Sequence, residues 1–155
     1  MDAAKAASKI FESIARYAAS GQREFAREDF ERLKELSARD PSRESIAELL
    51  AEAAFTMAVA DRIDLSGGYL ETIRTLRQQH PSLHAIALTE ARTLFYIIMG
   101  LHAGISGSDP DDRRDIDFLC GEFNAIAKPF SGNSEIASFI QAVNQEVLRS
   151  GSGSS

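Results

Sequence analysis

Two histidines raise the question of a metal site, because imidazoles four residues apart lie on one face of a helix. His80 and His84 have this spacing. Pro81 lies between them, and proline interrupts helical hydrogen bonding, so we expect His80 to follow one helix and His84 to belong to the next. The acidic residue that accompanies such a pair in zinc proteases is also absent from the sequence between them. We predict no metal site here.

An aspartate-rich stretch raises the same question for calcium. Residues 109–117 contain five aspartates in nine positions. An EF-hand loop needs glycine at its sixth position and a bidentate glutamate at its twelfth, where this chain has Arg114 and Cys120. We therefore interpret the stretch as the solvated start of a helix.

Nucleophilic catalysis and phosphate binding also lack their sequence patterns. The single cysteine, Cys120, shares an apolar stripe with Leu119 and Phe123, which predicts a buried structural thiol. A Gly-x-Ser-x-Gly elbow is absent, and the Ser66–Gly68 turn lacks the lysine of a phosphate-binding loop. We predict that the protein is not an enzyme and uses no cofactor.

The elements that carry these residues are predicted to be helices, because apolar residues recur every three or four positions. Seven such stripes give seven helices and an all-α fold, and no segment of the sequence alternates with a period of two. The clearest stripe is formed by Ile46, Leu49, Leu50, Ala53, Ala54 and Met57. Pro41, Pro81 and Pro110 are predicted to be the first residues of the third, fifth and sixth helices.

The sequence also carries an internal repeat of forty residues. That shift aligns Phe30 with Leu70, Leu33 with Ile73, Pro41 with Pro81, Ile46 with Ile86, Ala51 with Ala91, and Phe55 with Phe95. The match resumes at Pro129 after an insertion of eight residues, which we assign to a loop over 106–115. We predict one domain over 1–149, with three antiparallel helix hairpins, a capping helix and a flexible tail, at about 5–41, 42–81, 82–130, 133–149 and 150–155. The alternative is a compact helical bundle.

This pattern resembles the tetratricopeptide-repeat superfamily, in which a first helix carries a leucine followed by a small residue and a proline closes the second helix. Leu50 and Ala51 are similar to that pair, Ile73 and Leu76 fall at second-helix packing positions, and Pro81 is similar to the closing proline. The spacing of forty differs from the thirty-four of the family, and the chain has no tryptophan. The resemblance covers residues 5–148 and implies a right-handed array of hairpins.

Charge and composition narrow the choice of partners and compartment. A formal charge of -6 disfavours nucleic acid, because a phosphate backbone is repelled by an acidic protein. Basic and acidic residues number eight and eight in 1–40, four and six in 41–80, and five and nine in 81–155, so the acidity lies in the C-terminal half. The longest uncharged run, 93–108, is shorter than the roughly 20 residues of a membrane-spanning helix. A single cysteine and the lack of an export signal in 1–19 predict a cytoplasmic location.

The candidate binding residues follow from the repeat, because stacked hairpins place their first helices on one concave face. The forty-residue shift puts two rows on that face, formed by Glu12, Glu52 and Arg92 and by Arg16, Thr56 and Tyr96. We predict that these rows line a groove in which Tyr96 is an aromatic anchor and Arg92 pairs with a carboxylate. We interpret Phe55 and Phe95, beside them, as core, and the apolar helix over 94–101 as fully buried; the alternative for this helix is a partner-binding surface.

The function that we hypothesise is a non-enzymatic interaction module, adaptor or chaperone-like, that holds a peptide or amphipathic helix of a partner protein in this groove. A homodimer is a further possible assembly. The alternative is an all-helical regulatory domain that binds a small ligand in an apolar pocket around the fifth helix. A metal-dependent enzyme using His80 and His84 is a third hypothesis.

Overall fold

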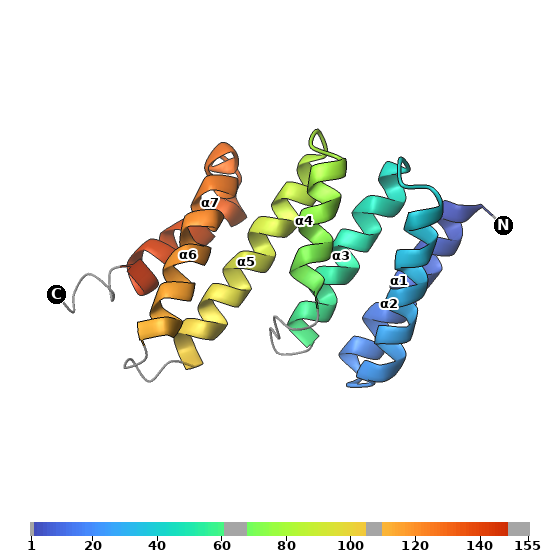
Figure 1. Cartoon of the computed structure of the whole chain (residues 1–155), viewed down its shortest axis with the longest axis horizontal. Helices are drawn as coiled ribbons and strands as arrows, with labels where there is room; N and C mark the ends of the chain where they lie inside the picture. The colour runs from blue at the N-terminus through green and yellow to red at the C-terminus, as the bar shows by residue number, and fades with distance from the viewer. Residues whose placement is uncertain (1, 61–67, 105–109, 149–155) are drawn as a thin grey trace. The chain divides into compact units, whose positions relative to one another are not determined.

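The computed structural model describes residues 2–60, 68–104 and 110–148. Over these residues the chain forms seven α-helices and no strand, which confirms the predicted all-α class (Figure 1). The helices are α1 (Ala3–Ala19), α2 (Arg23–Arg39), α3 (Glu44–Ala60), α4 (Tyr69–Gln79), α5 (His84–Gly104), α6 (Pro110–Ala127) and α7 (Ser134–Ala142). A short 3₁₀ turn, η2 (Lys128–Phe130), follows α6, and a π-helical segment, η3 (Val143–Leu148), continues α7.

Contacts between Cα atoms divide the chain into two compact units, and each is described by itself. Unit 1 is Met1–Glu90 and unit 2 is Ala91–Ser155, so the boundary falls within α5. The predicted hairpin boundaries and the TPR-like arrangement stay predictions. The predicted tail, 150–155, lies outside the described residues.

Helix α3 is the centre of unit 1, because it packs against α1, α2 and α4. Figure 1 shows α1 to α4 as neighbouring helices that run in alternating directions. The buried face of α3 is rich in alanine, and these small side chains let several helices approach it closely. Its larger residues Ile46 and Met57 are fully buried. Each such side chain stabilises the fold by about 1.5–3 kcal/mol.

Two turns of the same form precede α3 and α5. In Asp40–Arg43 and in His80–Leu83, the fourth backbone N–H donates to the first carbonyl at 3.1 Å. Pro41 and Pro81 occupy the second position of these turns, which suits the fixed φ of proline. The predicted placement of these two prolines as first helical residues is therefore wrong, since each helix begins three residues later. The same prediction is confirmed for Pro110, the first residue of α6.

The core of unit 2 is formed by α5, α6 and α7 around the fully buried ring of Phe123. Ile98, Ile116 and Ile136 are also buried there. The predicted loop over 106–115 is too long, because Pro110, with its fixed φ, already begins α6; residues 105–109 lie outside the described part of the chain.

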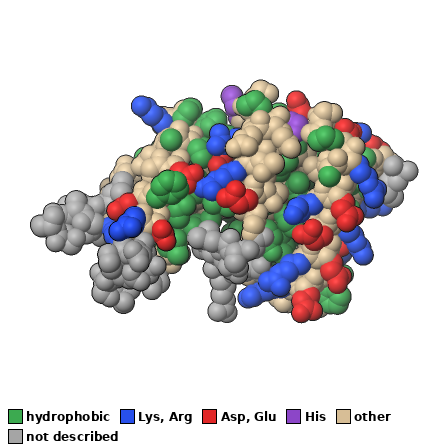
Figure 2. Space-filling model, viewed as in Figure 1, with side chains coloured by type: hydrophobic (Ala, Val, Ile, Leu, Met, Phe, Trp, Pro, Cys, Tyr) green, Lys and Arg blue, Asp and Glu red, His purple; other side chains and the backbone are tan. Residues whose placement is uncertain are grey.

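The surface of the first two helices carries charges of both signs. Figure 2 shows acidic and basic side chains intermingled over α1 and α2. This agrees with the equal numbers of acidic and basic residues in 1–40. Ion pairs that fit this pattern join Arg32 to Asp29 at 3.2 Å and Lys34 to Glu31 at 3.8 Å.

Candidate functional site

The two histidines do not share a helix, as the sequence predicts. His80 is the C-cap of α4, is buried, and its Nε2 lies 2.9 Å from the carbonyl oxygen of Pro41. His84 is the exposed first residue of α5. Among the described residues, no group of three or more histidine, cysteine, aspartate or glutamate side chains is arranged to hold a metal ion.

The Cys120 thiol is buried, which confirms the predicted burial. Burial, with a smaller contribution from the negative charge of Asp117, raises the pKa of this thiol to about 11, although Arg113 opposes the shift. A thiol with this pKa is protonated at neutral pH, and the thiolate is the reactive form. The geometry therefore favours packing over nucleophilic chemistry at Cys120.

Four of the predicted groove residues lie in unit 1, and they differ in exposure. Glu12 and Arg16 are exposed on α1, and the Arg16 guanidinium lies 6.0 Å from the centre of the Tyr17 ring. Glu52 and Thr56 are half-buried on α3, where the Thr56 hydroxyl donates to the Glu52 carbonyl at 2.9 Å. The packing of α1 against α3 brings the two helices side by side, but Glu52 and Thr56 already have partners inside the unit.

The other two predicted groove residues, Arg92 and Tyr96, lie one turn apart on α5 in unit 2. Arg92 Nε lies 3.2 Å from the Oε1 of Glu135 on α7. The Tyr96 side chain is 40% exposed, and its ring packs edge-on against Phe95 and Phe139, with centroids 5.6 and 6.2 Å away. The rings of Phe95 and Phe139 stack at 4.0 Å with an interplanar angle of 9°.

We call Phe95, Tyr96 and Phe139 the aromatic surface. Phe95 is half-buried within it, so its predicted assignment to the core holds only in part. The prediction that the helix over 94–101 is fully buried is wrong, because Tyr96 and Gly100 are exposed while Leu94, Ile97 and Ile98 form its buried face.

Sequence reasoning missed the two α7 residues at this place. Glu135 and Phe139 fall in the segment that we assigned to a capping helix. Their spacing of four residues equals that of Arg92 and Tyr96, so an acid and an aromatic ring on one helix match a base and an aromatic ring on the other. This complementary spacing is a signal that the sequence contained.

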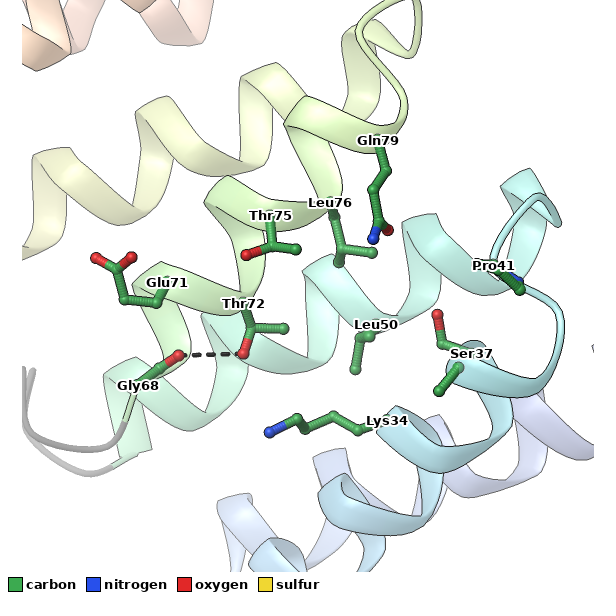
Figure 3. A pocket seen from close by; sticks show the side chains of 11 residues that line it. Lys34, Ser37, Pro41, Leu50, Gly68, Glu71, Thr72, Thr75, Leu76 and Gln79 are labelled. Carbon is green, nitrogen blue, oxygen red and sulfur yellow. Dashed lines mark hydrogen bonds between the residues drawn. The ribbon is translucent and has the colours of Figure 1, made fainter.

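Unit 1 contains a second candidate site, a pocket of about 410 Å³ between α2 and α4 that we call the α2–α4 groove. Its lining is contributed by α2 and the turn that follows it, by Leu50 of α3, and by α4 with its N-cap Gly68 (Figure 3). The lining residues are Lys34, Ser37, Ala38, Pro41, Leu50, Gly68, Glu71, Thr72, Thr75, Leu76 and Gln79. The repeat analysis placed binding on the first helices of the hairpins and therefore missed a groove between second helices.

Most of the groove lining is polar, and Leu50 and Leu76 are its large apolar residues. The Thr72 hydroxyl donates to the Gly68 carbonyl at 3.1 Å, and Arg74 Nη1 lies 2.9 Å from Glu71 Oε1. Figure 3 shows Lys34 and Gly68 toward one end of the groove and Pro41 and Gln79 toward the other. The groove thus offers hydrogen-bonding groups along its length and a lysine at one end.

A buried ion cluster in unit 1 was also missed. Glu90 on α5 is fully buried, its Oε1 lies 3.7 Å from Arg74 Nε, and its Oε2 accepts a hydrogen bond from Arg77 Nε. The neighbouring Thr89 hydroxyl lies 3.2 Å from Glu52 Oε1. A carboxylate between two guanidinium groups offsets its desolvation through pairing, so we interpret the cluster as structural.

No protein-family model, curated protein or solved structure matches this chain. Within the described ranges, no helix has both the length and the apolar character that crossing a bilayer requires. The aromatic surface and the α2–α4 groove are therefore the two candidate sites.

Proposed function

We propose that the protein is a non-enzymatic interaction module that binds an amphipathic helix or peptide of a partner protein, in the manner of a cytoplasmic adaptor or chaperone. The observation that carries the proposal is the aromatic surface, with a half-exposed tyrosine beside the ion pair of Arg92 and Glu135. Tyrosine and arginine are enriched among the residues that dominate binding energy at protein interfaces.

The chemistry of the partner follows from this arrangement. Tyr96 and Phe139 offer ring surface to apolar side chains of a partner, and the tyrosine hydroxyl adds a polar contact. Arg92 and Glu135 lie at the border and offer both signs of charge. Charges at the rim of an interface set orientation and specificity more than affinity. A helix with one apolar face and flanking charges fits this description.

The four predicted groove residues of unit 1 stay a separate prediction. Glu12 and Arg16 are exposed on α1, whereas Glu52 and Thr56 are half-buried and have partners within unit 1. The alternative of a small-ligand pocket around the fifth helix gains no support from the α2–α4 groove, because no residue of α5 lines that groove.

The test is capture of a partner by the tagged full-length chain, followed by comparison of variants. The double variant Arg92→Glu/Tyr96→Ala should lose at least about tenfold in affinity for the captured partner, since hot-spot residues contribute about 2 kcal/mol or more each. Its circular dichroism should stay helical, because Tyr96 is 40% exposed.

The matched control is Arg23→Glu/Phe25→Ala on α2, which changes an exposed arginine and an aromatic residue that is 53% exposed in unit 1. This control should retain binding. Equal binding by the Arg92→Glu/Tyr96→Ala variant and the unchanged chain would rule out the aromatic surface as the interaction site.

A further inference from the structure

We infer that the α2–α4 groove is a second binding site, which takes an extended peptide segment carrying one aliphatic and one acidic side chain. This inference goes beyond the proposed function, because the groove lies wholly in unit 1 and its lining differs in chemistry from the aromatic surface. Three features of the groove support this inference: its dimensions, the polar groups of its walls, and the placement of its leucines and its lysine.

The dimensions of the groove suit a short extended chain. Its volume of about 410 Å³ falls within the range of roughly 300–1,000 Å³ that ligand sites occupy. Lining residues recur along α4 from its N-cap Gly68 to Gln79, its last residue. Eleven helical residues at about 1.5 Å each give about 16 Å, the length of about five residues of extended peptide at 3.3 Å each.

The walls of the groove suit a peptide backbone. Ser37 on α2 and Thr75 and Gln79 on α4 each carry groups that donate and accept hydrogen bonds. The Thr72 hydroxyl gives its hydrogen to the Gly68 carbonyl, and Figure 3 shows its oxygen directed toward Gly68. An extended peptide presents both N–H and C=O groups along its length, whereas a helix satisfies these groups internally. The polar walls therefore favour an extended ligand over a helical one.

The leucines and the lysine define the side chains of the ligand. The apolar part of the lining consists of the exposed Ala38 and Pro41 together with Leu50 and Leu76, each 4% exposed, and it accepts an aliphatic side chain. The Lys34 side chain is 43% exposed at one end, with its ammonium 3.8 Å from Glu31, a distance that leaves room for a closer carboxylate. On the facing wall, Glu71 is bonded to Arg74, which reduces its repulsion toward an acidic ligand. Charge complementarity at Lys34 thus selects an acidic side chain.

The test uses the full-length chain and a library of acetylated, amidated hexapeptides in which each position is varied in turn. We expect binding above background, with a preference for Leu, Ile or Val at one position and for Asp or Glu at another. Thr75→Phe should fill the groove and weaken binding of the best hexapeptide by about tenfold or more. Lys34→Glu should remove the acidic preference and leave the aliphatic one.

Matched controls separate groove effects from general ones. Gln78→Phe adds the same ring at an exposed α4 position outside the groove, and Lys9→Glu reverses an exposed lysine on α1; both should bind as the unchanged chain does. The Arg92→Glu/Tyr96→Ala variant should also keep hexapeptide binding, so failure here and failure of the proposed function can be distinguished. No enriched hexapeptide, or equal losses in Thr75→Phe and Gln78→Phe, overturns the inference. A dimer in sedimentation that Thr75→Phe abolishes would assign the groove to a second copy of the chain and also overturn it.

Discussion

The α2–α4 groove and the aromatic surface are two opposite ways in which packed helices leave a surface for a partner. In unit 1 the facing side chains of α2 and α4 are small or polar, such as Ser37, Ala38 and Thr75, and they do not fill the space between the helices. In unit 2 the facing side chains of α5 and α7 are large rings, and one of them, Tyr96, extends beyond what the helices bury. The comparison teaches that the exposed groove residues, such as Ala38 and Thr75, can change with little effect on stability, whereas the aromatic surface depends on the core beneath it.

The largest effect is expected for the ring on which the aromatic surface rests. Phe123 is fully buried, and its ring centre lies 6.3 Å from that of Phe95. Phe123→Ala should lower the free energy of unfolding by about 3–5 kcal/mol, because it leaves a cavity in the core. Urea denaturation measures this change. Phe118, on the same helix but 68% exposed, is the control, and Phe118→Ala should change stability by less than about 0.5 kcal/mol. Equal effects of the two variants would mean that unit 2 has no dependence on its buried ring.

The second-largest effect is the pH dependence that the buried Cys120 thiol of unit 2 gives to the free energy of unfolding. The pKa of the Cys120 thiol is about 11 in the folded state against 9.0 for the ordinary group. Below pH 9 both states are protonated; as the pH rises toward 11, only the unfolded thiol ionises, so the free energy of unfolding falls. The full slope of 1.36 kcal/mol per pH unit applies only above pH 9.0, so the loss between pH 8.5 and 10.5 is about 2 kcal/mol.

Cys120→Ala should remove this contribution. The free energy of unfolding is measured by denaturation at pH 8.5 and 10.5 for the unchanged protein and for Cys120→Ala. The contribution of the thiol is the difference between their two pH-dependent changes, in which the contributions of other titrating groups cancel. Parallel pH dependences in the two chains would contradict the assignment of a raised pKa to this thiol.

The smallest effect is expected in the groove. Thr75→Val removes a hydroxyl at an exposed position of α4 and should change the free energy of unfolding by less than about 0.5 kcal/mol. The same change should weaken hexapeptide binding by a few fold, the effect of one hydrogen bond of about 1 kcal/mol. Isothermal titration calorimetry measures the second quantity. If Thr75→Val lowered the free energy of unfolding but kept full hexapeptide affinity, Thr75 would serve packing and not binding, which would contradict the contrast drawn between the groove and the aromatic surface.

Much of the fold follows from spacing along the chain. The stripe from Ile46 to Met57 predicts α3 because helical periodicity is a local property, and the proline after His80 predicts the end of α4 for the same reason. The turns of Pro41 and Pro81 were assigned to helix starts because the first helical position and the second position of a turn require the same φ. A single sequence does not distinguish these two uses of proline.

The candidate sites follow less completely, because they depend on contacts between helices. Arg92 and Tyr96 could be selected from the repeat, but their partners Glu135 and Phe139 belong to a helix more than thirty residues away. The α2–α4 groove exists because side chains from separate helices fail to meet, and no local pattern records such a gap. The burial of Glu90 is similar, since the two arginines that pair with it come from the preceding helix.

The contact between His80 and Pro41 has a consequence for the order of the two proline turns. In the first turn, Asp40 accepts a hydrogen bond from Ser42 at 3.2 Å and lies 3.9 Å from Arg43, which also pairs with Asp2 of the N-terminal cap of α1 at 2.9 Å. The second turn instead reaches back through the His80 ring to the carbonyl of the first. The two turns are therefore not interchangeable. With Asp40 and His80 exchanged, the imidazole in the first turn would have no earlier proline turn to contact. The carboxylate in the second turn would face the carbonyl oxygen of Pro41, which cannot donate a hydrogen bond to it. The two turns therefore share a backbone hydrogen bond but differ in the side-chain contacts that hold them, with Asp2 for the first turn and with the first turn itself for the second.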